Sequence, residues 1–168
     1  MTVDAFGSLP SLPPKARLVV EIFRRLAAFR EDYDEAVLRG LMTVLCRHMA
    51  AAEADKVMSD VMIMHNEICF RVPRGLAFND PGDAFASAHE RALLLLIAHA
   101  AEPSDDEAAA EAAEALGIDS HRVLRICASL VARSLAGGGV DVASGLPVRD
   151  RISGMRFPGH EASLGLSR

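Results

Sequence analysis

Residues 113–130 read AEALGIDSHRVLRICASL, and this stretch decides the predicted fold. An alanine-rich helix is predicted to end at Leu116, because Gly117 can take the left-handed conformation that closes a helix without a Cβ clash. Asp119 or Ser120 can then cap the start of a second helix. Two helices joined by so short a turn form a helix-turn-helix pattern.

The second helix is predicted over residues 120–135, with two faces of different chemistry. Apolar side chains at spacings of three, four and seven are predicted to form its buried face: Val123, Ile126, Cys127 and Leu130. The opposite face carries polar and basic side chains: Ser120, His121, Arg122, Arg125 and Ser129. Because the arginine fork matches guanine O6 and N7, this face is predicted to contact DNA bases and phosphates.

The stretch resembles the Ala-x-x-Leu-Gly-hydrophobic-Ser pattern of bacterial helix-turn-helix regulators, with Ala113, Leu116, Gly117, Ile118 and Asp119 in the matching positions. Length and layout are most nearly similar to the MarR-like winged-helix group. The resemblance spans 18 of the 168 residues. It implies a dimeric, sequence-specific regulator of transcription that binds double-stranded DNA with its second helix in the major groove.

Apolar residues with a 3.6-residue period predict further helices at residues 14–30, 34–51, 53–71, 84–101 and 106–116. In the first of these, charged side chains are predicted to lie largely on the outer face: Arg17, Glu21, Arg24 and Arg25. The helix at 53–71 is apolar around much of its circumference, so we expect it at the centre of the fold or in a homodimer interface.

A short β-hairpin, or wing, is predicted after the second motif helix. Val140 and Val142 alternate with polar residues, and after a turn at 144–145 the alternation resumes, with Arg149 and Arg151 on one face. These two arginines are predicted to hold phosphate or enter a minor groove. The predicted fold class is therefore mainly all-α, with a helical N-terminal region followed by a winged-helix-like module that ends in the hairpin.

Turn-forming residues between Pro73 and Asp83 mark the boundary between two parts of the chain. The predicted organisation is a flexible lead-in at 1–13, a helical core or dimerisation region at 14–72, the winged-helix-like module at 84–153 and a tail at 154–168.

Charge is distributed unevenly along the chain, whose formal net charge is −5. Residues 80–119 carry one basic residue against ten acidic ones, whereas residues 120–168 carry seven arginines against three acidic residues. The acidic run 105–107 would repel phosphate if the first motif helix approached DNA. The alternative function is therefore an all-helical protein-interaction or adaptor module that uses its acidic 102–119 surface.

Motifs of enzymes and metal sites are not recognised in this sequence. It contains no glycine-rich phosphate loop, nucleophile elbow or His-Glu-x-x-His pair, so we expect a protein that is not an enzyme and has no cofactor. His65 and Cys69 stand four residues apart, but Cys46 and His48 stand two apart and point in opposite directions on a helix, so no metal site is expected.

The longest apolar run, residues 92–98, is too short to span a membrane, and the N-terminus lacks a signal-peptide pattern. We therefore expect a cytoplasmic protein without a membrane partner. A pocket between the helical and winged parts would suit a small-molecule effector.

Overall fold

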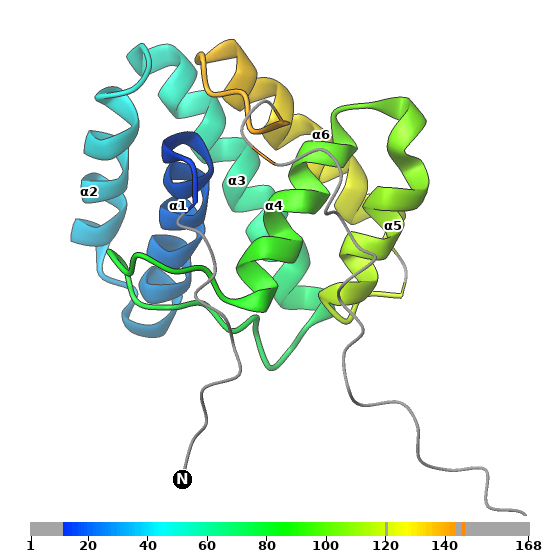
Figure 1. Cartoon of the computed structure of the whole chain (residues 1–168). Helices are drawn as coiled ribbons and strands as arrows, with labels where there is room; N and C mark the ends of the chain where they lie inside the picture. Colours follow the sequence, from blue (N-terminus) through cyan, green and yellow to red (C-terminus); the bar gives the residue numbers. More distant parts are fainter. Residues whose placement is uncertain (1–11, 120, 144–145, 147–168) are drawn as a thin grey trace, which may run out of the picture.

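The computed structural model describes residues 12–119, 121–143 and 146, and its regular structure in this part is entirely helical (Figure 1). The α-helices are α1 Pro14–Asp32, α2 Glu35–Cys46, α3 Ala51–Arg71, α4 Ala88–Ala100, α5 Asp106–Ala115 and α6 Arg122–Gly137. A 3₁₀ turn, η1 (Pro103–Asp105), leads into α5. The predicted fold class, mainly all-α, is confirmed for the described residues.

The helices begin where the sequence supplies suitable N-terminal residues. Pro14 occupies the start of α1, where its missing N–H is not needed. The Asp34 carboxylate accepts a hydrogen bond from the Ala36 N–H at the start of α2, at 2.8 Å. Ser87 and Glu90 form a reciprocal capping box at the start of α4, which fixes the direction in which the chain enters that helix.

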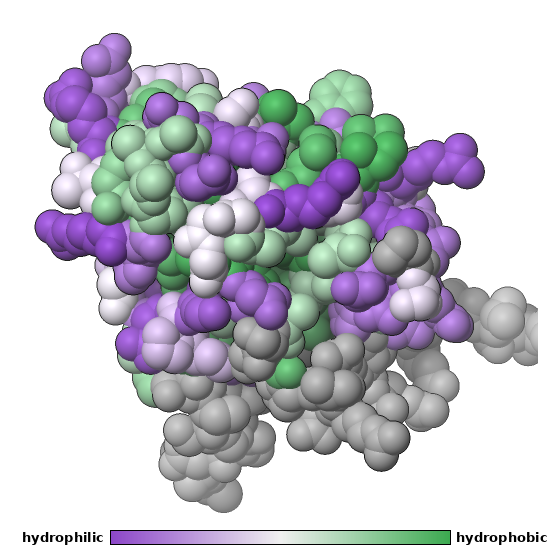
Figure 2. Space-filling model, turned by 90° about the horizontal axis from the view of Figure 1, so that it is seen from above, coloured by the Kyte–Doolittle hydropathy of each residue, from purple (hydrophilic) through white to green (hydrophobic). Residues whose placement is uncertain are grey.

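Helix α3 lies at the centre of the fold, where it packs against α6, α2 and α1 (Figure 1). Its inner face is almost completely removed from solvent at Val57, Val61, Met64 and Ile68. Of the two positions predicted for this helix, the centre of the fold or a homodimer interface, the structure shows the first. Ile63 and Phe70 on its outer face remain exposed to solvent. A separate view of the molecular surface, Figure 2, also shows hydrophobic residues grouped on part of one face.

A buried ion pair ties α1 to α4. Arg24 Nε donates to Glu90 Oε1 at 2.7 Å, and both side chains are almost inaccessible to solvent. The prediction that Arg24 lies on the outer face of its helix is therefore wrong. Its guanidinium turns inward because Glu90 and the backbone carbonyls of Asp83 and Phe85 together satisfy its donors.

Glu90 also anchors the connection between α3 and α4. Its two carboxylate oxygens accept hydrogen bonds from the backbone N–H groups of Asn79 and Ser87, at 2.9 and 2.7 Å. Burial raises the pKa of this carboxyl, but the hydrogen bonds from Arg24, Ser87 and Asn79 outweigh burial and leave the pKa below its ordinary value. The turn-rich segment predicted as a boundary therefore joins two groups of helices that share one continuous core.

His65 is a buried histidine on α3, and it makes folding sensitive to acid. Burial, assisted by the positive charge of Arg30, lowers the pKa of His65 from 6.5 to about 4. The unfolded chain therefore binds more protons than the folded chain between these values. We expect the free energy of unfolding to fall as the pH drops from 6.5 toward 4, by at most about 3 kcal/mol from this group.

His65→Phe keeps a ring beside Phe23, whose centroid lies 6.4 Å from that of His65, and removes the titration. Urea unfolding measured at several pH values should show a flatter pH dependence for this variant between pH 6.5 and 4. If the variant keeps the wild-type slope, other groups set the acid sensitivity.

The predicted wing is not found in the described residues. The structure describes 140–143 and 146 of that stretch, and these residues form no strand. Val140 instead completes the end of α6, because its N–H donates to Leu135 O at 2.8 Å after Gly139 takes a φ of +82°. Val140 and Val142 are both buried. Arg149 and Arg151 lie outside the described residues.

Within the described ranges, no helix has both the length and the apolar character needed to cross a membrane.

Candidate binding groove

The helix pair predicted from residues 113–130 is present in the structure. Helix α5 is closed by Gly117, whose φ is +76°, and the Ile118 N–H donates to Ala113 O at 3.0 Å. Together with the hydrogen bond from the Gly117 N–H to Glu114 O, this is a Schellman-type helix end. The prediction of two helices separated by a turn at 117–119 is therefore confirmed.

The buried face of α6 differs from the predicted one. Val123 and Ile126 are 45% and 56% exposed, and Leu130 is partly buried. Of the predicted set only Cys127 is buried, and the inward stripe of α6 consists of Leu124, Cys127, Ala128, Val131 and Leu135. The prediction that Val123 and Ile126 are buried is wrong.

The position of Arg133 explains this orientation of α6. Arg133 follows Ile126 by seven residues, so the two side chains lie about 20° apart around the helix. A helix that buried Ile126 would also bury the Arg133 guanidinium without a partner, which costs several kcal/mol. With Leu124 and Val131 inward, α6 packs against both α3 and α4, while α5 packs mainly on α4. The exposure of Ile126 contradicts the packing on which the helix-turn-helix prediction relied.

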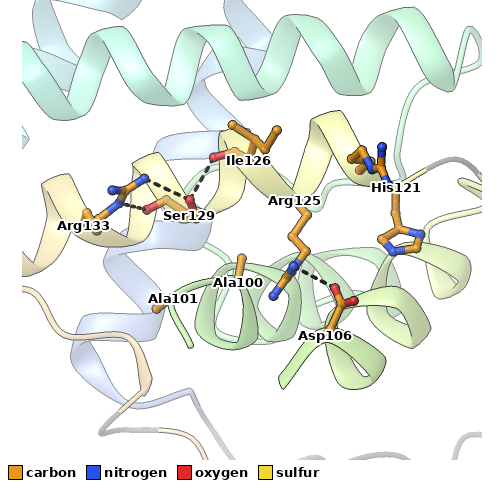
Figure 3. Close-up of a pocket in the computed structure, with 9 residues that line it drawn as sticks. Ala100, Ala101, Asp106, His121, Arg125, Ile126, Ser129 and Arg133 are labelled. Atoms are coloured by element: carbon orange, nitrogen blue, oxygen red, sulfur yellow. Dashed lines mark hydrogen bonds and ion pairs between the residues drawn. The ribbon is translucent and has the colours of Figure 1, made fainter. Parts of the chain in front are cut away.

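The outward face of α6 borders a groove of about 710 Å³ (Figure 3). Three elements enclose this groove, namely the C-terminal end of α4, the N-terminal end of α5 and the first three turns of α6. The lining residues are Ala100, Ala101, Asp106, His121, Arg122, Arg125, Ile126, Ser129 and Arg133. The groove therefore combines a small apolar surface with three arginines and one acidic residue.

Arg125 is held across the groove by Asp106 (Figure 3). Its Nη1 lies 2.7 Å from Asp106 Oδ1, whereas its Nε is buried without a hydrogen-bond partner among the described residues. A buried donor without a partner is unfavourable until an acceptor reaches it. Arg125 therefore lies in the wall of the groove, with one terminal nitrogen paired to Asp106 and its Nε without a partner among the described residues.

Arg133 is positioned one turn beyond Ser129. Its Nε donates to the Ser129 carbonyl and its Nη2 to Ser129 Oγ, both at 3.2 Å, while Ser129 Oγ donates to Ile126 O at 3.1 Å. These local contacts hold the Arg133 guanidinium against the helix surface beside the groove (Figure 3). Arg122, at the other end of the groove, is exposed.

Four of the predicted DNA-contacting residues converge on this groove: His121, Arg122, Arg125 and Ser129. Ser120 lies outside the described residues. Arg133 and the two alanines at the end of α4, Ala100 and Ala101, were not predicted from the sequence. The spacing of Arg133 from Ser129 and Arg122, four and eleven residues, could have placed it on the same helix face.

The outward face of α5 has the opposite charge. Glu107, Glu111 and Glu114 are exposed at spacings of four and three, while Ala109 and Ala113 on the opposite side are buried. Helix α5 contains no basic residue and α6 contains no acidic residue. Adjacent helices thus present an acidic surface and a basic groove.

The histidines and cysteines considered as metal ligands do not lie together in one site. His65 is buried and its Nδ1 lies 3.8 Å from Cys69 Sγ, while Cys46 and His48 are exposed at the end of α2. In the part of the chain that the structure describes, no three histidine, cysteine or acidic side chains are grouped to hold a metal ion.

Comparisons with protein-family models, with curated proteins and with solved structures give no match to this chain.

Proposed function

We propose that this chain is a binding module and not an enzyme, and that its groove receives an acidic, partly apolar helical segment of a protein. One observation carries the proposal: Arg122, Arg125 and Arg133 line one groove together with a small apolar surface formed by Ile126 and two alanines. Carboxylates suit the arginine forks, and leucine-sized side chains suit the surface formed by Ile126 and the two alanines.

The exposed apolar side chains of α6 favour a protein partner over DNA. Val123 and Ile126 lie on the same outward face as the arginines, and a DNA major groove offers few apolar contacts beyond thymine methyl groups. Asp106 lines the groove and pairs with Arg125 at 2.7 Å, which reduces the positive charge available to the phosphates of a duplex. A peptide with one or two carboxylates needs only Arg122 and Arg133 as partners, whereas a duplex brings a row of phosphates.

Sequence-specific binding to double-stranded DNA is the second candidate function. Three arginines on α6, with no acidic residue on that helix and a glycine turn before it, favour this candidate. In that case Arg122 and Arg125 would contact bases or phosphates, and the chain would act as a transcriptional regulator.

A competition experiment separates the two candidates. The probe is a fluorescent, helix-forming peptide with leucine and glutamate along one face, hereafter the acidic peptide, and the competitor is a pool of random duplex DNA. We expect the acidic peptide to bind and the DNA not to displace it. Tight binding of the duplex, with enrichment of one sequence from the pool, would support the DNA candidate and overturn the primary one.

Charge reversal in the groove should abolish most of this binding. Arg122→Glu/Arg133→Glu is expected to weaken binding of the acidic peptide by at least about tenfold, which corresponds to about 1.4 kcal/mol. Arg39→Glu/Arg74→Glu makes the same change of charge at exposed positions away from the groove and should leave affinity nearly unchanged. Equal losses in the two variants would show attraction by general charge and contradict a specific groove.

A further inference from the structure

The acidic face of α5 matches the chemistry that the groove on α6 is proposed to accept. It carries Glu107, Glu111 and Glu114 along one side of a helix whose other exposed or half-exposed residues are mostly alanine. Such short side chains allow another helix to approach closely. Within the described residues these three glutamates make no ion pair, whereas Asp106 at the start of the same helix already pairs with Arg125.

We propose that the partner is a second copy of this chain, with the acidic face of α5 from each protomer seated in the α6 groove of the other. This inference rests on the proposed function, since it names the occupant of the same groove. Charge complementarity supports it: α5 supplies only carboxylates, and α6 supplies only arginines as charged groups. In a two-fold dimer each protomer inserts its own α5 face into the partner's groove and receives the partner's α5 in its groove, so the same contact is made twice.

The contact also accounts for the exposed apolar residue at the centre of the groove. Ile126 is 56% exposed and stands between Arg122 and Arg133 along the outward face of α6. A docked α5 brings its alanines against Ile126 while its glutamates reach the arginines on either side. Burial of apolar surface beneath a ring of ion pairs is the usual organisation of a protein interface.

Reciprocal charge reversal tests the proposal. Glu111→Arg/Glu114→Arg places positive charge on α5, and Arg122→Glu/Arg133→Glu places negative charge on α6. In a dimer of either variant alone, both contacts bring like charges together. In a mixed dimer, one contact joins the two altered surfaces and the other joins the two wild-type surfaces, so opposite charges meet at both.

Sedimentation velocity should therefore show a wild-type dimer that dissociates as salt is added, since exposed charge pairs are screened. Each variant alone should be monomeric, and an equimolar mixture should again form a dimer containing one copy of each. Glu31→Arg/Asp55→Arg, which changes the same charge at exposed positions elsewhere, should remain dimeric. Circular dichroism of every variant checks that the fold is intact.

If charge reversal unfolds a variant, Arg122→Gln/Arg133→Gln and Glu111→Gln/Glu114→Gln serve in its place. Each should weaken the dimer at least about tenfold, and mixing them should not restore it, because no opposite charges are regained. A wild-type monomer at all concentrations would overturn the inference, as would a dimer that persists in both charge-reversal variants.

A synthetic peptide of residues 104–119 separates failure of this inference from failure of the proposed function. If the chain is monomeric but the groove binds the unrelated acidic peptide, a second copy is not the partner and the proposed function stands. If neither peptide binds, both proposals are wrong. Binding of the 104–119 peptide that is lost in Arg122→Glu/Arg133→Glu supports both.

Discussion

Replacing Glu90 with alanine is expected to lower the free energy of unfolding by about 3 to 5 kcal/mol. The substitution leaves the Arg24 guanidinium buried without its carboxylate partner, although the carbonyls of Asp83 and Phe85 still accept from it. It also removes the acceptors of the Asn79 and Ser87 N–H groups, so the connection between α3 and α4 loses its anchor. A loss of this size is a large fraction of the stability of an ordinary domain.

Urea unfolding followed by circular dichroism measures this effect. Glu35→Ala is a suitable control, because Glu35 forms an exposed ion pair with Arg39 at 3.6 Å, and exposed pairs contribute little. We expect the control to unfold at nearly the wild-type urea concentration. A loss below about 1 kcal/mol in Glu90→Ala would contradict a structural role for the buried pair.

Leu124→Ala should destabilise the fold by about 2 to 5 kcal/mol, whereas Ile126→Ala should change stability little. Leu124 is completely buried on the inward stripe of α6, while Ile126 is 56% exposed at the groove. The orientation predicted from the sequence, with Ile126 buried, requires the opposite order. The pair of substitutions therefore tests which face of α6 packs on the core.

The variant Ile126→Ala should also change the affinity for the acidic peptide. Ile126→Ala is expected to weaken binding of the acidic peptide, because it removes the largest apolar contact in the groove. If Ile126→Ala instead unfolds as readily as Leu124→Ala, the outward orientation of α6 is wrong and the groove with it.

Helix ends could be predicted from the sequence where the residues at that position alone determine the backbone conformation. The start of α1 at Pro14 and the helix end at Gly117 were predicted from backbone geometry. The helix predicted at 84–101 instead begins at Ala88, because Ser87 and Glu90 form a capping box there. The central position of α3 followed from its wide apolar circumference, which one neighbour could not cover.

The orientation of α6 could not be decided in the same way. Its apolar residues cover more than half of the helix, so the stripe through Ile126 and the stripe through Leu124 both satisfy helical spacing. The arginine at 133 distinguishes them, because only the second stripe keeps this charge in solvent. The polar positions therefore decide which face of this helix is buried as much as the apolar positions do.

Contacts between residues far apart in the sequence could not be predicted from the sequence either. Arg24 and Glu90 are 66 residues apart, and nothing in the helix around Arg24 indicates that its guanidinium has a buried partner. The groove likewise depends on how the ends of α4 and α5 meet α6. Four of the residues that line it were nevertheless predicted as binding residues from the sequence. A helix face rich in arginine indicates an anionic partner, whether that partner is DNA or protein.

The side-chain Nε–H signals of arginine, followed by NMR while the acidic peptide is added, test the central claim most directly. We predict that the signals of Arg122, Arg125 and Arg133 shift together, because all three side chains line the groove. Arg24 is an internal control, because its Nε already donates to Glu90 at 2.7 Å and should not respond. Unchanged groove signals at saturating peptide, or shifts confined to arginines elsewhere in the chain, would contradict the claim that this groove is the binding site.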